Sequence, residues 1–361
     1  MPWQLRTNIK GPRGLQGPQG TPGQGFGSNA VEFFQDSAES VWDVAVGYRD
    51  SSGRARILIG RRKDGTFYPD LGSGGGGTTP TDKPAIVRWG DSLTANSSSS
   101  AADLSTRLGG RTIVTQGIGG QTSPQIAARQ GGTPARATVT GGLIPASGSV
   151  AVTLSERLRS DTTTSTPVVI AGVAGSFVAT DSTAYLAGTF TRTTAGLPAV
   201  VPPGTPVQTG YEYRDMWPIL WYGRNSFTSD AAQAQIVSDL RGSLEWNYHR
   251  EHALILSIPP WVGEETGSSG RARLDAANAA IRDAFPREFV DTSARLRNAD
   301  VITASGNTPT QQDLTDIANG LTPTVFRTGS NGTVDNGHLG PAGYIALNMI
   351  INEIYTARGW K

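Results

Sequence analysis

Residues 85–93 read Ala-Ile-Val-Arg-Trp-Gly-Asp-Ser-Leu, a short apolar run that ends in a polar turn. Similar runs recur along the chain and alternate with segments of helical periodicity. The expected strands cover residues 85–89, 112–116, 217–222, 253–258 and 288–290. The expected helices cover residues 101–108, 123–130, 230–248, 270–285 and 341–357. Strands that alternate with helices in this way predict an α/β fold with a doubly wound parallel sheet.

Polar and glycine residues follow three of the expected strands. Ser92 comes after the first strand, Gly120 after the second and Asn225 after the third. Ligands of doubly wound sheets bind outside the carboxyl ends of the strands. We therefore expect these three residues to meet at one edge of the sheet.

The histidines narrow the chemistry that this edge can support. A serine hydroxyl is a weak nucleophile near neutral pH, so it needs a base within hydrogen-bond reach and a carboxylate that orients the base. The chain has three histidines, His249, His252 and His338. Only His338 has a carboxylate, Asp335, three residues before it, and it lies in a glycine-rich loop that opens a helix. The sequence therefore favours His338 as the base.

Four separated blocks together resemble the SGNH hydrolases, also called GDSL-type esterases. They are Gly-Asp-Ser-Leu at 90–93, Gly-Gly-Gln-Thr-Ser at 119–123, Gly-Arg-Asn-Ser at 223–226 and Asp-Asn-Gly-His at 335–338, and they stand in the family's order. The resemblance implies a flavodoxin-like three-layer α/β/α fold. It also implies a carboxylic ester hydrolase that uses a serine nucleophile and neither a cofactor nor a metal.

The resemblance assigns a role to each matched residue. Ser92 would be the nucleophile, His338 the base and Asp335 the carboxylate that orients the base. The oxyanion donors would be the backbone amides of Ser92 and Gly120 and the side chain of Asn225.

Some positions depart from the family pattern or admit two interpretations. Gln121 and Ser226 stand where the family frequently has aspartate, which leaves the catalytic set whole but alters neighbouring loop contacts. Trp89 and Tyr222 adjoin the strand ends and either line the substrate cleft or pack in the core.

His249 and His252 are spaced three apart, as zinc ligands often are, but no third ligand with metal-site spacing is evident. We interpret this pair as structural.

The composition excludes several classes of protein. The chain has 361 residues, 31 basic and 30 acidic, so its net charge of +1 gives no field that favours nucleic acid. It has no cysteine, and no run approaches the roughly 20 apolar residues of a membrane span. Residues 1–6 lack the apolar core of a signal peptide.

The segment before the hydrolase-like part suggests a stalk. Residues 11–25 carry glycine at every third position together with proline, the collagen pattern, although a disordered Pro/Gly linker is the alternative. Short alternating strands follow, and about forty residues with so little core predict association of copies. We expect an N-terminal segment at 1–27, a small β trimerisation region at 28–71 and a glycine-rich linker at 72–82.

Residues 133–213 interrupt the strand–helix alternation. They are rich in Thr, Val, Gly and Pro and show several short strand patterns, including 168–173. This predicts an inserted all-β sandwich or barrel within a hydrolase domain formed by residues 83–132 and 214–361. The insert either reaches the catalytic rim or hangs below it.

These patterns together predict a serine esterase on a trimeric stalk. The leading hypothesis is an O-deacetylase or deacylase of host cell-surface glycan or envelope esters, because the stalk and the absent signal peptide look like a bacteriophage tail or tail-fibre protein. Its location would be the virion tail, with other tail proteins as partners. The alternative is a non-catalytic receptor-binding tail module that grips host glycan.

Overall fold

The computed structural model describes residues 32–35, 42–49, 55–62, 67–68 and 83–361. The chain forms two compact units, residues 1–79 and 80–361. The expected collagen-like triplets and the glycine-rich linker lie outside the described residues.

The first unit contains a four-stranded antiparallel sheet in the order β1-β2-β3-β4. Its strands are β1 (Glu32–Gln35), β2 (Trp42–Arg49), β3 (Ala55–Arg62) and β4 (Phe67–Tyr68). Two register shifts interrupt the pairing of β2 with β3. Trimerisation through this region stays a prediction.

The second unit is built on a parallel sheet of five strands in the order β17-β16-β15-β5-β6. These strands are β5 (Ile86–Gly90), β6 (Ile113–Gly117), β15 (Trp217–Trp221), β16 (Leu254–Leu256) and β17 (Phe289–Val290). Numbered along the chain, they stand in the order 2-1-3-4-5, the flavodoxin-like order of doubly wound sheets. β5 and β15 are buried at every position because helices cover both faces.

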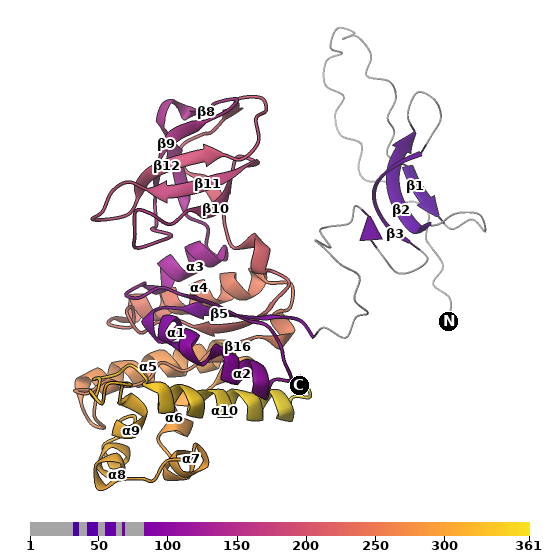
Figure 1. The fold of residues 1–361 in the computed structure, drawn as a ribbon. Coiled ribbons are helices and arrows are strands. Elements are labelled where there is room, and N and C mark those ends of the chain that lie inside the picture. Colours follow the sequence, from indigo (N-terminus) through magenta and orange to yellow (C-terminus); the bar gives the residue numbers. More distant parts are fainter. Residues whose placement is uncertain (1–31, 36–41, 50–54, 63–66, 69–82) are drawn as a thin grey trace. The chain divides into compact units, whose positions relative to one another are not determined.

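Two apolar cores lie between the sheet and the helices that cover its two faces. On one face, Val87 and Leu220 pack against α3 (Ser123–Gln130), α4 (Asp230–Trp246) and α5 (Ser269–Ala284). On the other, Ile86 and Ile219 pack with α1 (Ser92–Asn96), α2 (Ala101–Arg107), α6 (Thr292–Leu296) and α10 (Pro341–Ala357). Alternate strand residues thus enter opposite cores. Figure 1 shows α3 and α4 on one side of the sheet and α10 on the other.

Short helices complete this unit. They are η1 (Ser97–Ser100), η2 (Thr140–Gly142), η3 (Tyr211–Tyr213), η4 (Arg250–His252), α7 (Ala299–Ala304), α8 (Gln311–Ala318) and α9 (Thr324–Arg327). Among the described residues, no helix is both long and apolar enough to cross a membrane.

The inserted region forms a closed barrel in the order β10-β11-β12-β9-β7-β14. Its strands are β7 (Arg136–Val139), β9 (Ser149–Leu154), β10 (Thr166–Ile170), β11 (Val173–Ala179), β12 (Ala187–Arg192) and β14 (Thr205–Gln208). β8 (Leu143–Ile144) and β13 (Ala199–Val200) form a separate pair. Alternating residues fill the barrel with a third apolar core, which Ala128 of α3 joins. Figure 1 shows the barrel strands on the α3 side of the parallel sheet.

One expected strand, residues 168–173, is wrong as a single element. The chain turns back within it, since Ile170 pairs with Val173 across a two-residue turn. Ala171 and Gly172 both have positive φ, at 49° and 77°, which this kind of hairpin turn requires. The usual Asn-Gly or Gly-Gly signal is missing because alanine occupies the first position.

Candidate active site

The end of β5 places Ser92 at the first turn of α1. Asp91 caps this helix, because its side chain accepts a hydrogen bond from the Leu93 amide at 3.0 Å. Gly90 permits the tight strand-to-helix turn, since a Cβ there would lie 2.1 Å from Thr94 Oγ1 and 2.6 Å from the Trp221 carbonyl oxygen. Ser92 is half-buried just beyond the carboxyl end of β5.

A loop at the far end of the sequence brings His338 to Ser92. His338 Nε2 lies 2.8 Å from Ser92 Oγ, and His338 Nδ1 lies 3.2 Å from Asp335 Oδ1. Asp335 Oδ1 also accepts hydrogen bonds from the backbone amides of Gly337 and His338, at 2.8 and 2.7 Å. Ser92 and His338 are 246 residues apart in the sequence. A serine, an imidazole and a carboxylate in this arrangement can transfer a proton from the hydroxyl to the ring.

The Asp335 carboxylate is favoured in its ionised form. Partial burial alone would raise its pKa, but the amide hydrogen bonds from Gly337 and His338 and the nearby imidazole outweigh burial and lower the pKa. The carboxylate can therefore hold the Nδ1 hydrogen of His338 and leave Nε2 free to accept the serine proton.

The three expected oxyanion donors differ in the hydrogen bonds that they already make. The backbone amides of Ser92 and Gly120 donate to no acceptor among the described residues. Asn225 Nδ2 instead donates to the Gln121 carbonyl at 3.0 Å and to Asp91 Oδ2 at 3.4 Å. Asn225 therefore joins the loop of Asp91 and Ser92 to the Gly120 loop, and its amide would have to turn partly away from these acceptors to bond a substrate.

Asp91 also belongs to this cluster, although no pattern in the sequence singles it out. Its side chain is fully buried directly before Ser92, where burial raises its pKa to about 6. The Leu93 amide and the charges of His338 and Arg224 oppose this increase. Gly-Asp-Ser is a common turn sequence at protein surfaces, so the burial of Asp91 is evident only from the fold.

Replacing Asp91 with asparagine should change how stability depends on pH. The folded pKa of about 6 exceeds the ordinary 3.8, so Asp91 stabilises the fold fully below pH 3.8 and this contribution is lost as pH rises through 6. Asp91→Asn removes this titration and keeps an oxygen for the Leu93 cap. Chemical denaturation at pH 4 and pH 7.5 gives the unfolding free energies of both proteins. Relative to wild type, the variant should gain about 2–3 kcal/mol of stability between pH 4 and pH 7.5. A constant difference would contradict a buried, titrating Asp91.

Trp261 lies against the candidate base, His338. Its ring centroid is 5.4 Å from that of His338, and the Val262 amide donates to the Asn336 carbonyl at 2.8 Å. Arg224 stacks 4.5 Å over the Trp261 ring and donates two hydrogen bonds to Glu264. The loop after β16 thus supports the loop that carries His338. Its position after a strand end is the signal that could have indicated this role.

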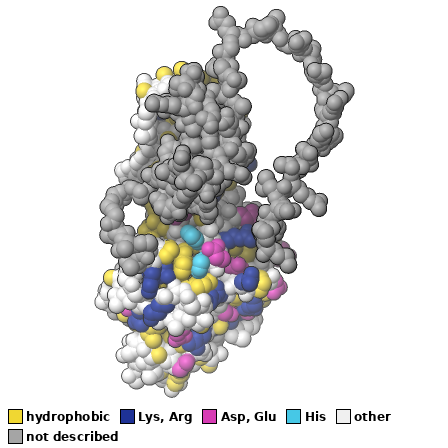
Figure 2. All heavy atoms as spheres, turned by 90° about the vertical axis from the view of Figure 1, so that its right-hand side faces the viewer, with side chains coloured by type: hydrophobic (Ala, Val, Ile, Leu, Met, Phe, Trp, Pro, Cys, Tyr) yellow, Lys and Arg dark blue, Asp and Glu magenta, His cyan; other side chains and the backbone are white. Residues whose placement is uncertain are grey.

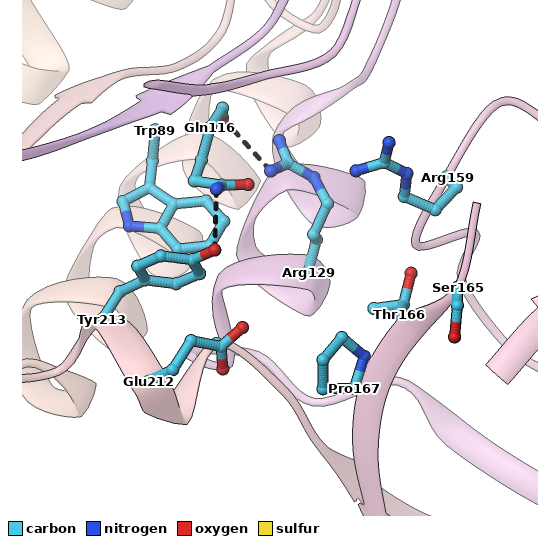
Figure 3. A pocket seen from close by; sticks show the side chains of 10 residues that line it. Trp89, Gln116, Arg129, Arg159, Ser165, Thr166, Pro167, Glu212 and Tyr213 are labelled. Carbon is cyan, nitrogen blue, oxygen red and sulfur yellow. Dashed lines mark hydrogen bonds between the residues drawn. The ribbon is translucent and has the colours of Figure 1, made fainter. Parts of the chain in front are cut away.

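Trp89 and Tyr222 lie apart from this chain of contacts. Tyr222 is 1% exposed in the core under α4, its hydroxyl lies 3.0 Å from Ser243 Oγ, and burial raises its pKa, so it lines no open cleft. Trp89 is also buried but borders a pocket between the α/β layers and the barrel (Figure 3). The interpretation of these residues as packing groups fits Tyr222 best.

The other two histidines meet a third possible metal ligand. His249, Glu251 and His252 offer ligand atoms that all lie within 4.8 Å of one another, so the expectation of no third ligand is wrong. Glu251 Oε1 lies 3.0 Å from His252 Nδ1, and the His252 ring stacks on Trp217. Figure 2 shows histidine side chains beside acidic and basic ones on one face. These groups could bind a divalent cation, but η4 precedes β16 and so lies at the edge of the sheet opposite Ser92.

Comparison with known proteins gives one informative relative. No protein-family model matches the chain. The tail spike protein of Salmonella phage epsilon15 is 30% identical to it over 286 residues, which cover 70% of this chain and 25% of that protein. The chain thus spans about a quarter of the length of this curated relative.

A solved structure also matches at low similarity. LAE5, an alpha/beta hydrolase enzyme from the metagenome of Lake Arreo in Spain, has 13% sequence identity and a TM-score of 0.37. The match covers 77% of this chain and 96% of that one.

Proposed function

We propose that this chain is a serine esterase of the SGNH type that removes acyl groups from surface glycans and is carried on a phage tail. The observation that carries the proposal is the 2.8 Å contact between His338 Nε2 and Ser92 Oγ, with Asp335 on the other ring nitrogen. These groups come from the two ends of the α/β unit and meet at the carboxyl edge of a doubly wound sheet.

In the proposed reaction, Ser92 Oγ attacks the ester carbonyl carbon while its proton moves to His338 Nε2. The Ser92 and Gly120 amides bind the oxyanion, and Asn225 joins them by turning from Gln121. The intermediate collapses by breaking the bond to the sugar oxygen, which takes the proton from His338. Water, deprotonated by His338, then attacks the acyl-enzyme. The bond to Ser92 Oγ breaks, His338 returns the proton to this oxygen, and the carboxylic acid leaves.

The accessibility of the site supports a large leaving group. Gly119, Gly120, Asn225 and Asp335 are exposed, whereas Ser92 and His338 are half-buried. An ester on a polymer can approach such an edge without entering a deep pocket. The identity with a tail spike protein supports the location on a phage tail, where trimerisation through residues 28–71 would complete the assembly.

The direct experiment is an esterase assay on the purified chain. Wild type should release p-nitrophenol from p-nitrophenyl acetate and acetate from isolated bacterial envelopes, and Ser92→Ala should release neither above background. If wild type and Ser92→Ala were equally inactive on a panel of short acyl esters while wild type still bound envelopes, the receptor-binding alternative would replace this proposal.

Gly337→Ala should impair ester hydrolysis through sterics alone. A Cβ at Gly337 would lie 1.7 Å from Trp261 Cδ1, so either the indole or the adjoining His338 must move. A displacement of about 1 Å at a reacting group lowers the rate on the order of 10²-fold. We expect a loss of this size in kcat/KM for p-nitrophenyl acetate, with folding checked by circular dichroism.

A double-mutant cycle separates this clash from general damage. Trp261→Ala removes the indole, so the double variant should lose much less activity than the product of the two single losses. Purely multiplicative losses, or full activity in Gly337→Ala, would show that the contact does not position His338.

A further inference from the structure

A pocket with a volume of about 140 Å³ lies at the seam between the α/β layers and the barrel (Figure 3). Trp89 of β5 and Arg129 of α3 line it from the α/β side. Arg159 and Thr166 line it from the barrel side. The mechanism proposed above uses none of these side chains, so the pocket needs its own explanation.

Two guanidinium groups face this pocket without a strong carboxylate partner. Arg129 is 4% exposed and donates only to neutral oxygens, those of Gln116, Gly90 and Gln121, at 3.0–3.2 Å. Burial lowers the pKa of Arg129 to about 9, and the charge of Arg159 acts in the same direction. Figure 3 shows the guanidinium group of Arg159 pointing toward that of Arg129, whose terminal nitrogens face Gln116. Like charges brought together in this way favour a bound anion.

Arg159 has capacity left to bind such an anion. Its side chain is 30% exposed, and the carboxylate of Asp161 lies 3.6 Å from Nε, beyond a good hydrogen bond. Its Nε is buried and has no hydrogen-bond partner among the described residues. Thr166 Oγ1, from the adjoining start of β10, is also buried and has no partner in the described part of the chain. Buried polar groups are normally paired, so these two atoms are available to a ligand in the pocket.

The remaining walls suit a hydroxylated ring better than a bare inorganic anion. The rings of Trp89 and Tyr213 meet edge to face at 5.4 Å and form an aromatic side of the pocket. Glu212 lines the pocket as well and offers acceptor oxygens to hydroxyl groups. Aromatic rings bind the apolar faces of sugars, whereas an inorganic phosphate makes no use of them.

The pocket is also coupled to the candidate active site by the same barrel loop. Arg157 donates to the Gly120 carbonyl at 3.1 Å, and Gln121 Nε2 lies 3.4 Å from the Leu158 carbonyl. Arg129 Nη2 donates to the carbonyl of Gly90, two residues before Ser92. A ligand held by Arg159 would therefore lie beside the loops that carry Ser92 and Gly120.

We propose that this pocket binds the carboxylate-bearing residue of an acidic glycan, such as a hexuronic acid unit. The two guanidinium groups would hold the carboxylate, and Thr166, Glu212 and the aromatic wall would hold the ring and its hydroxyls. This inference deepens the proposed function, on which it rests for the choice of glycan as the ligand class. The pocket at the seam and the barrel loop beside it would then select which glycan reaches Ser92.

The test measures binding directly in the full-length Ser92→Ala protein, so that no turnover interferes. Ligand-observed NMR titrations with methyl β-D-glucuronide, methyl β-D-glucoside and inorganic phosphate compare an acidic sugar, its neutral counterpart and a bare anion. The glucuronide should bind at least about tenfold more tightly than either of the others, since a charge-assisted hydrogen bond contributes about 1.5–3 kcal/mol.

Arg159→Gln in the same background should weaken glucuronide binding at least about tenfold. Arg136→Gln is the matched control, because it removes the same charge from an exposed barrel position outside the pocket and should leave binding unchanged. Thermal melts of both variants check folding, and Thr166→Val, which keeps the side-chain shape, tests the site again without changing charge.

Each other outcome overturns the inference. These outcomes are equal binding of glucuronide and glucoside, phosphate binding as tight as glucuronide binding, and no binding of any of the three ligands. An unchanged affinity in folded Arg159→Gln would place the acidic sugar elsewhere. The esterase assay is separate: an inactive wild type that binds glucuronide through Arg159 would refute the esterase and leave this pocket standing.

Discussion

Replacing Ser92 with alanine is expected to lower ester turnover by about 10⁴- to 10⁶-fold, as loss of the nucleophile does in other serine hydrolases. The variant keeps the backbone amides that we propose to bind the oxyanion and loses only one half-buried hydroxyl, so the fold should survive. The measurement is kcat/KM for p-nitrophenyl acetate, with circular dichroism spectra compared between the two proteins.

Ser98 supplies a matched control for this change. It is an exposed serine six residues further on, in η1, and it makes no hydrogen bond to the described residues through its side chain. Ser98→Ala should hydrolyse the ester at the wild-type rate. Full activity in Ser92→Ala would remove Ser92 from the mechanism, and equal loss in both variants would point to damage to the fold.

His338→Ala is expected to reduce kcat by about 10⁴-fold or more, nearly as much as Ser92→Ala, because the serine then has no base within reach. The double variant Ser92→Ala/His338→Ala should be no slower than either single variant, since the two residues act as one unit. His249→Ala is the control, because this histidine lies beside η4 and has no contact with Ser92. Multiplicative losses in the double variant would show that His338 does not act through Ser92.

The sequence was most informative where a strand ended. Parallel strands open at one edge, so Ser92, Gly120 and Asn225 had to come near one another once the strands were recognised. The spacing of Asp335 and His338 predicted a contact that the structure contains. β5, the strand that precedes Ser92, begins and ends within one residue of the expected bounds.

Contacts among loops could not be predicted in the same way. The bonds from Asn225 to Asp91 and Gln121, and the tilted contact of Trp261 with His338, join residues that are 77 to 134 positions apart in sequence. They depend on loop conformation and leave no periodic pattern. Arg129 lies in the last turn of α3, a position where a cation is ordinary in a sequence. Its burial at the barrel seam depends on how the insert folds back onto α3.

Elements with weak periodicity were missed for a related reason. α6, α7, α8 and α9 are only four to eight residues long, too short to show a 3.6-residue pattern. The β10–β11 turn was missed because Ala171 adopts a positive φ that the sequence does not signal. The pairing of these strands fixes the turn, so tertiary structure outweighs the local preference of alanine.

The proposed mechanism requires Ser92 to carry the acyl group during turnover, and this intermediate can be trapped. Wild-type protein is mixed with excess p-nitrophenyl acetate, quenched in acid within the first turnovers and digested, and the peptides are analysed by mass spectrometry. We predict that the peptide containing Ser92 gains the mass of one acetyl group in wild type and that this adduct is absent from Ser92→Ala. Rapid ester hydrolysis with the acetyl group on another residue, or at the same rate in Ser92→Ala, would contradict the claim.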